Sequence, residues 1–145
     1  MCRMPGPFRR ALDHWQDYLR SAPTIIGGDF NNHVVFDKPV HEGNFAKLDA
    51  HLRRLGFFSA YHAHHGVELG AEKEPTHYWR DRKRDGWRYH IDHVYMPETL
   101  RHALLDYQVG AFDSWIRHSD HMPLIIDLDE RAMLPATAKM TGGAV

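Results

Sequence analysis

Three short segments of the chain carry acidic, amide and histidine side chains in patterns that suit chemistry at a phosphate. The first segment is Gly27-Gly28-Asp29-Phe30-Asn31. On an extended chain, Asp29 and Asn31 project to one face and Phe30 turns toward the core. A carboxylate can orient or deprotonate water, and a carboxamide can donate to a phosphoryl oxygen without adding a repelling charge. A solvated Asx turn at a strand end explains the same residues equally well.

The second segment, residues 89–95, places an acid in the interior of an expected strand. Alternation puts His90, Asp92 and Val94 on one face and His93 on the opposite face. An acid inside a strand is costly unless a partner satisfies it. A histidine is the obvious partner, because a carboxylate can hold an imidazole in one tautomer. The alternative is an edge strand whose polar residues lie in water.

The third segment, residues 118–123, places Asp120 and His121 on a loop before a strand. Pro123 suits the first position of that strand. On a loop, two adjacent side chains can face one cavity, where a histidine beside a carboxylate can stabilise a phosphoryl transition state or bind a metal. A polar turn is the alternative. Each segment alone is weak, but the three in this order, each at a strand end, predict one common site.

Together the segments resemble the last three motifs of the endonuclease/exonuclease/phosphatase superfamily, the DNase I-like and exonuclease III-like metal-dependent phosphoesterases. The resemblance rests on residues 28–31, 91–95 and 119–123 and covers residues 8–128. It implies that Asp29 orients or activates the attacking water and that Asn31 holds the phosphate and the nucleophile. It also implies that Asp92 orients the catalytic His121. Asp120 resembles the acidic residue near the metal, Mg²⁺ or Mn²⁺.

The matched motifs belong to the second half of the family's domain. The implied fold class is therefore α/β: the second half of a four-layer DNase I-like sandwich, a mixed β-sheet with flanking helices and no N-terminal half. The family's metal-binding glutamate precedes the Gly-Asp-x-Asn strand, whereas every glutamate of this chain follows Asn31. We expect residues 1–129 to be a partial enzyme domain, weakly active or inactive alone. We also expect an exposed apolar sheet face that self-associates or binds the missing half.

Hydrophobic periodicity predicts the elements that must position these segments. One amphipathic helix is expected around Phe8, Leu12, Trp15 and Leu19, and a second from an N-cap at Asn44 to Gly56. A short buried strand over residues 24–30 separates them. The remaining expected elements are a strand over 57–61, an exposed loop over 62–75, strands 76–82 and 87–96 around a two-residue Asp85-Gly86 turn, a helical turn over 97–103, strands over 105–112 and 122–128, and a disordered tail over 130–145.

The hairpin around residues 76–96 is the main indication of substrate. Residues 80–88 contain five basic and two acidic side chains, a local charge of +3. Aromatic rings can stack on bases while basic groups pair with phosphates, which favours nucleic acid. Aromatic pairs that merely support the hairpin are the alternative, and relatives that cleave lipid or small phosphoesters also need positive charge. The expected substrate-binding residues are Tyr78, Trp79, Arg82, Lys83, Arg84 and Trp87.

Composition limits the remaining possibilities. Eighteen basic and nineteen acidic residues give a pI near 6.9, so a nucleic acid must bind a local patch. The single cysteine, Cys2, and the lack of an apolar leader or membrane span favour a cytoplasmic protein without membrane contacts. Thirteen histidines are unusually many; His62, His64 and His65 could capture a transition metal, although a solvated loop is preferred. A non-catalytic remnant that binds nucleic acid or protein also remains open.

Overall fold

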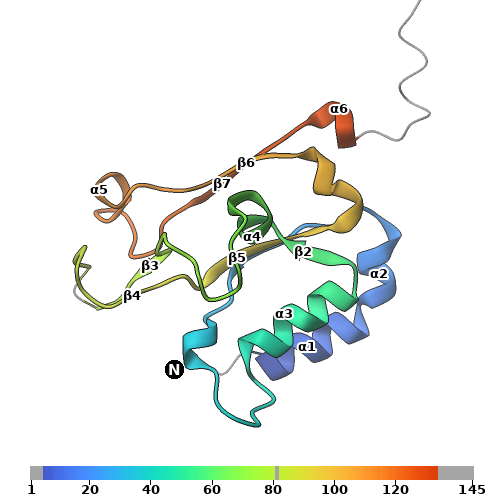
Figure 1. Cartoon of the computed structure of the whole chain (residues 1–145), viewed down its shortest axis with the longest axis horizontal. Helices are drawn as coiled ribbons and strands as arrows, with labels where there is room; N and C mark the ends of the chain where they lie inside the picture. The colour runs from blue at the N-terminus through green and yellow to red at the C-terminus, as the bar shows by residue number, and fades with distance from the viewer. Residues whose placement is uncertain (1–4, 81, 134–145) are drawn as a thin grey trace, which may run out of the picture.

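The computed structural model describes residues 5–80 and 82–133, so that Cys2 and most of the expected tail lie outside the description. No helix in these two ranges is long and apolar enough to span a membrane. The elements in chain order are α1 (Pro5–His14), α2 (Gln16–Ser21), β1 (Ile26–Asp29), the 3₁₀ helix η1 (Val34–Phe36), α3 (Phe45–Arg54), β2 (Phe57–Ser59), α4 (Ala60–His65), β3 (His77–Tyr78), β4 (Arg88–Tyr89), β5 (Asp92–Pro97), the 3₁₀ helix η2 (Glu98–Ala103), β6 (Leu104–Val109), α5 (Phe112–Trp115), β7 (Leu124–Leu128) and α6 (Glu130–Met133) (Figure 1).

A three-stranded antiparallel sheet of order β1-β5-β2 forms the centre of the molecule. β5 is the middle strand, and its residues 92–96 are all buried. The register pairs Asp29 at the end of β1 with Asp92 at the start of β5. Two of the three predicted chemical segments therefore meet because of strand pairing, although more than sixty residues of chain separate them.

Two apolar clusters cover opposite faces of this sheet, because neighbouring residues of a strand point to opposite sides. Tyr95 belongs to the cluster that packs under α1 and α3, together with Phe30, Phe45 and other side chains. Met96 belongs to the cluster that packs under α4, η2 and the β6–β7 pair. Figure 1 shows α1 and α3 on one side of the sheet and β6 and β7 on the other. The central sheet is thus covered by apolar side chains on both faces.

Two further antiparallel pairs, β3–β4 and β6–β7, complete the described strands. The α/β class expected from sequence is confirmed, but the single mixed sheet is not: every described pairing is antiparallel. The β3–β4 pair joins consecutive strands, and a short connection between consecutive strands favours antiparallel pairing. An isolated bridge between His77 and His121 connects the β3–β4 pair to the third predicted segment.

Several predicted elements differ in the N-terminal half. The expected first helix is interrupted at Trp15, which is 57% exposed rather than packed. The expected buried strand is the exposed strand β1, because it pairs with β5 on one edge and with no described strand on the other. α3 begins and ends where predicted, but Asp37 caps it: its carboxylate accepts from the backbone N–H groups of Phe45 and Ala46 at 2.6 and 3.0 Å. The Asn44 side chain instead bonds to the backbone of Lys38: its oxygen accepts from the Lys38 N–H at 3.0 Å, and its amide donates to the Lys38 carbonyl at 2.7 Å.

Other differences lie in the second half of the chain. The strand expected over 57–61 ends at Ser59, and the expected loop begins with α4, which buries His62. The predicted two-residue hairpin turn is wrong, since β3 and β4 have two residues each and the wider connection 79–87 joins them. β4 and β5 are separate strands, because residues 90 and 91 leave the ladder. The first four residues of the expected disordered tail form α6.

Candidate active site

His121 and Asp92 form a hydrogen-bonded pair at the end of the central sheet. Nδ1 of His121 lies 3.0 and 3.1 Å from the two carboxylate oxygens of Asp92. Because a carboxylate only accepts, Nδ1 carries the proton and donates it, which leaves Nε2 for chemistry. Asp92 is buried, whereas the His121 side chain is 32% exposed. The pair therefore presents one imidazole edge to solvent with its orientation fixed from behind.

Thr76 organises this pair and was not identified from sequence. Its side chain is fully buried; its hydroxyl donates to Asp92 Oδ2 at 2.6 Å and accepts from the backbone N–H groups of Ile91 and Asp92 at 3.0 Å each. Its carbonyl accepts from the Met122 N–H at 2.7 Å. Thr76 thus contacts Asp92 directly and binds the backbone of the residue that follows His121. No local signal marks it, because its partners lie far along the chain.

Asp29 and Asn31 come together through a turn rather than through extended alternation. β1 ends at Asp29, and Asn31 has a left-handed backbone with φ of +50°. The Asp29 carboxylate accepts from the Asn31 backbone N–H at 2.7 Å and from its side-chain amide at 3.1 Å. Asparagine tolerates this backbone conformation better than most residues. Phe30 is buried as expected, so both polar side chains remain at the surface beside the histidine pair.

Asp29, Asp92 and His121 form a group that can hold a metal ion, since one ligand atom of each lies within 4.8 Å of the others. Mg²⁺ and Mn²⁺ prefer oxygen donors and are usually held by one or two carboxylates with water and phosphate oxygens. The exposed Asp29 carboxylate, with Asp92 beside it, meets this requirement. Asp120 lies outside the group, with its carboxylate 3.8 Å from Nε2 of His77 and 3.9 Å from a guanidinium nitrogen of Arg82.

His77 stands directly beside His121, and the sequence offered no functional argument for it. The two ring centroids are 4.4 Å apart, with planes inclined by 33°. Burial lowers the pKa of His77, and the neighbouring His121 lowers it further. A neutral ring can pack against His121 without charge repulsion. His77 therefore forms one wall of the site.

The predicted substrate-binding residues divide between the two faces of the β3–β4 pair. Tyr78 is buried against Phe112, at a centroid distance of 4.5 Å, and its ring is not available to a ligand. Arg84 lies over the same Phe112 ring and pairs with Asp113. Among the others, Trp87 is 71% exposed, Trp79 is half-buried, Arg82 approaches Asp120 and Lys83 is exposed.

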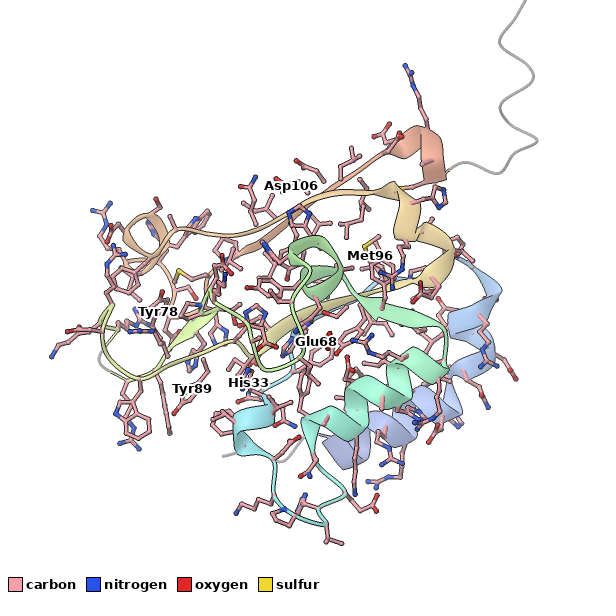
Figure 2. All side chains as sticks on the ribbon, in the orientation of Figure 1. His33, Glu68, Tyr78, Tyr89, Met96 and Asp106 are labelled. Atoms are coloured by element: carbon pink, nitrogen blue, oxygen red, sulfur yellow. The ribbon has the colours of Figure 1, made fainter. Side chains whose placement is uncertain are left out.

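The opposite face of the same pair carries a row of aromatic rings. Tyr89 is the register partner of His77, and antiparallel partners lie on the same face of a sheet. The Tyr89 ring lies 4.8 Å from that of Phe36 and 6.4 Å from that of Trp79. The guanidinium of Arg80 covers Trp79 at 4.7 Å. Figure 2 labels Tyr78 and Tyr89 on these two sides. Tyr89, the middle ring of the row, is the residue paired with His77, so the row lies next to that wall of the site.

The three histidines considered as a transition-metal site do not converge. His62 is buried against Glu72, His64 lies 3.2 Å from Asp106, and the His65 ring lies tilted against that of Tyr61 with centroids 4.4 Å apart. Of the residues that the structure describes, only the Asp29 group brings three possible ligands together. The rings of His64 and His65 lie 4.8 Å apart, but His62 turns toward Glu72 and does not join them.

No protein-family model matches the sequence, and no curated protein matches it significantly. Among solved structures, the chain is similar to the endonuclease domain of TRAS1, a telomere-specific non-LTR retrotransposon. The match has a TM-score of 0.59 and 17% sequence identity and covers 86% of this chain. The two chains share a fold. This chain spans about half of its structural neighbour, because the match covers 52% of that domain.

Proposed function

We propose that this chain is the part of a metal-dependent phosphodiester hydrolase that carries the catalytic histidine, His121, and that the enzyme acts on nucleic acid. The observation that carries the proposal is the Asp92–His121 pair beside the Asp29–Asn31 turn. The chain shares its fold with a domain described as an endonuclease, and that likeness supports the reaction class. An imidazole oriented by a buried acid, an exposed carboxylate and a carboxamide can supply the proton transfer and the phosphate hydrogen bonds that promote phosphoester hydrolysis.

Each residue has a distinct task in this proposal. Asp92 holds His121 and stabilises its imidazolium form, whose Nε2–H donates to a phosphate oxygen. Asp29 orients the attacking water and accepts its proton, while the Asn31 amide donates to the phosphate. Mg²⁺ or Mn²⁺, held by the exposed Asp29 carboxylate with Asp92 beside it, would supply positive charge at the scissile phosphate, whereas Asp120, the metal residue expected from sequence, lies outside this group.

We further propose that the chain is only weakly active alone, because another segment supplies a metal-binding carboxylate. β1 has one edge without a described partner, and a groove lined by Leu12, Trp15, Tyr18 and Ile26 runs beside it. A neighbouring hollow continues along β1 to Asp29. Trp15 and Tyr18 are 57% and 69% exposed. A strand added to this edge would bury these rings and bring its side chains to Asp29; a second copy of the chain is the other possible occupant.

Nucleic acid is the proposed substrate because rings and cations occur together beside the site. The Phe36–Tyr89–Trp79 row can stack on bases, and the basic side chains of residues 80–88 can pair with phosphates. We expect a labelled oligonucleotide to bind purified 1–145 more weakly as salt increases. Replacing Arg82, Lys83 and Arg84 together by alanine should weaken this binding. Binding that is insensitive to salt would contradict the nucleic-acid proposal.

The reaction is tested by oligonucleotide cleavage with excess protein and Mg²⁺ or Mn²⁺. We expect slow cleavage that chelation abolishes and that His121→Ala reduces at least about 10²-fold. His118→Ala removes an exposed histidine of the same loop and should have no effect. Equal cleavage by His121→Ala would contradict the proposed site. Turnover as fast as that of intact nucleases would contradict the need for a further carboxylate, and salt-dependent binding without cleavage would favour a non-catalytic binding module.

A further inference from the structure

Glu72 is a buried acid that the proposed chemistry does not use. Its side chain is 1% exposed and lies in the connection between α4 and β3. Nε2 of His33 lies 2.9 Å from one carboxylate oxygen, and Nε2 of His62 lies 2.8 Å from the other. The Gly70 backbone N–H also donates to the carboxylate at 3.1 Å. Three donors from three segments thus converge on one buried charge, which requires such pairing to remain ionised.

Local hydrogen bonds fix the direction of both imidazole contacts. The Val35 backbone N–H donates to Nδ1 of His33 at 3.1 Å, so this nitrogen is unprotonated and Nε2–H donates to Glu72. Nδ1 of His62 lies 2.6 Å from the Ser59 hydroxyl, which can donate to it and leave Nε2–H for Glu72. Burial alone would raise the pKa of Glu72, but hydrogen bonds from His33 and His62 outweigh burial and lower it.

His33 is two residues from Asn31, whose left-handed backbone needs support from its surroundings. Asn32 is anchored as well: its side-chain amide donates to the Gly43 carbonyl at 3.2 Å, and its own carbonyl lies 3.2 Å from Nε2 of His93. Glu72 adds the contact that ties this loop to α4. Figure 2 shows His33 on the loop that follows β1.

The same segment also reaches the other side of the site. Lys73, next to Glu72, donates its backbone N–H to the Tyr61 hydroxyl at 3.1 Å. Thr76, which holds Asp92, follows four residues after Glu72. Glu72 thus contacts the loop that holds Asn31 through His33, and it belongs to the same chain segment as Thr76, which holds Asp92.

We propose that Glu72 is a positioning residue that fixes the Asn31 loop relative to the Asp92–His121 pair through His33 and His62. It touches neither substrate nor metal and acts through the two histidines. The inference rests on the proposed function only for its consequence on the reaction rate. Its structural part, a loop held by a buried carboxylate, stands on the contacts alone.

Glu72→Gln in the full chain tests the proposal, with Glu68→Gln as the matched control because Glu68 is exposed in the same connection. The carboxamide of Glu72→Gln would place its NH₂ group, a donor, against the N–H of one of the two imidazoles. Two donors cannot form a hydrogen bond, so that contact is lost. We expect the maximal cleavage rate of Glu72→Gln to fall about 10- to 100-fold, while its oligonucleotide Kd stays within about twofold of wild type. Glu68→Gln should leave both quantities unchanged.

Amide hydrogen exchange gives a second readout that does not require activity. The Val35 amide, which donates to His33, should exchange at least about tenfold faster in Glu72→Gln, while the Leu48 and Leu52 amides of α3 keep their protection. Wild-type Val35 exchange in the variant would overturn the inference, as would a wild-type cleavage rate. Absence of cleavage by the wild-type chain together with fast Val35 exchange in Glu72→Gln would overturn the proposed function and support the loop contact.

Discussion

The Asp92 carboxylate lies 3.0 Å from Nδ1 of His121, although 29 positions separate the two residues in the chain. Asp92 is the first residue of strand β5, and His121 lies on the loop before β7. The His121 side chain is partly exposed, and one of its ring nitrogens lies within 4.8 Å of an oxygen of the exposed Asp29 carboxylate. An imidazole fixed in this way has a defined tautomer and a stabilised cationic form.

Asp92→Asn should abolish most cleavage while preserving the fold. The carboxamide fills the same space but no longer stabilises the imidazolium, and it can hold His121 in the wrong tautomer. We expect a loss of about 10²- to 10⁴-fold in cleavage rate, the range typical of a disabled acid–base group. Asp127→Asn, at an exposed position of β7, is the control and should cleave normally. A rate within threefold of wild type would show that the pair has no catalytic role.

Thr76→Val should destabilise the protein. Valine has nearly the same shape, but it leaves the N–H groups of Ile91 and Asp92 without their acceptor. We expect the free energy of unfolding in urea to fall by about 2–4 kcal/mol, because each buried unsatisfied donor costs about 1–3 kcal/mol. Thr99→Val, at an exposed position of η2, should change it by less than about 0.5 kcal/mol. Equal unfolding midpoints for the two variants would contradict the role given to the Thr76 hydroxyl.

Trp79→Ala should weaken binding to single-stranded oligonucleotides. Stacking of one base on an aromatic ring contributes about 1–3 kcal/mol, so we expect Kd to rise about 5- to 150-fold. Fluorescence anisotropy at fixed salt measures this change. Trp15→Ala removes an exposed ring at the junction of α1 and α2 and should leave Kd unchanged. If both variants bind like wild type, the aromatic row supports only the hairpin.

Stability should decrease in acid because His93 is buried in its neutral form. Burial lowers the pKa of His93 to about 3 from an ordinary value of 6.5. Below pH 6.5 the unfolded chain binds a proton at His93, whereas His93 in the folded chain stays neutral until the pH approaches 3. The contribution of His93 to the free energy of unfolding is therefore fully present at pH 7 and is lost as the pH falls toward 3. The loss is at most about 1.4 kcal/mol per pH unit from this group. Burial also lowers the pKa of His90, which adds a loss of the same sign.

His93→Phe separates this contribution from the rest. Phenylalanine can keep the stacking on Phe45, whose ring lies 4.4 Å from that of His93. We expect urea midpoints measured between pH 7 and 4 to fall less steeply for His93→Phe than for wild type. His118→Phe, at an exposed position, should keep the wild-type slope. Parallel pH profiles for His93→Phe and wild type would show that another group governs the acid loss.

The sequence by itself determined the α/β class, the limits of α3 and the three chemical segments. These features are local: an apolar period of 3.6 residues, a glycine that follows a helix, and acids or histidines at strand ends depend on near neighbours in the chain. The burial of Phe30 likewise follows from one apolar residue between two polar ones. Local patterns of this kind survive in the fold because each element must bury its apolar side.

Only the tertiary structure decided which residues meet. Thr76 and Asp92, His77 and His121, and Glu72 with His33 are contacts between separate elements, set by strand register and by packing across the sheet. Tertiary packing also turned Tyr78 inward and left Trp15 outside, although both suited other positions by pattern. Hydrophobic periodicity predicts whether a side chain faces the interior or the surface. It does not predict which residue of another element that side chain contacts, because the contact depends on the free energy of the whole packed arrangement.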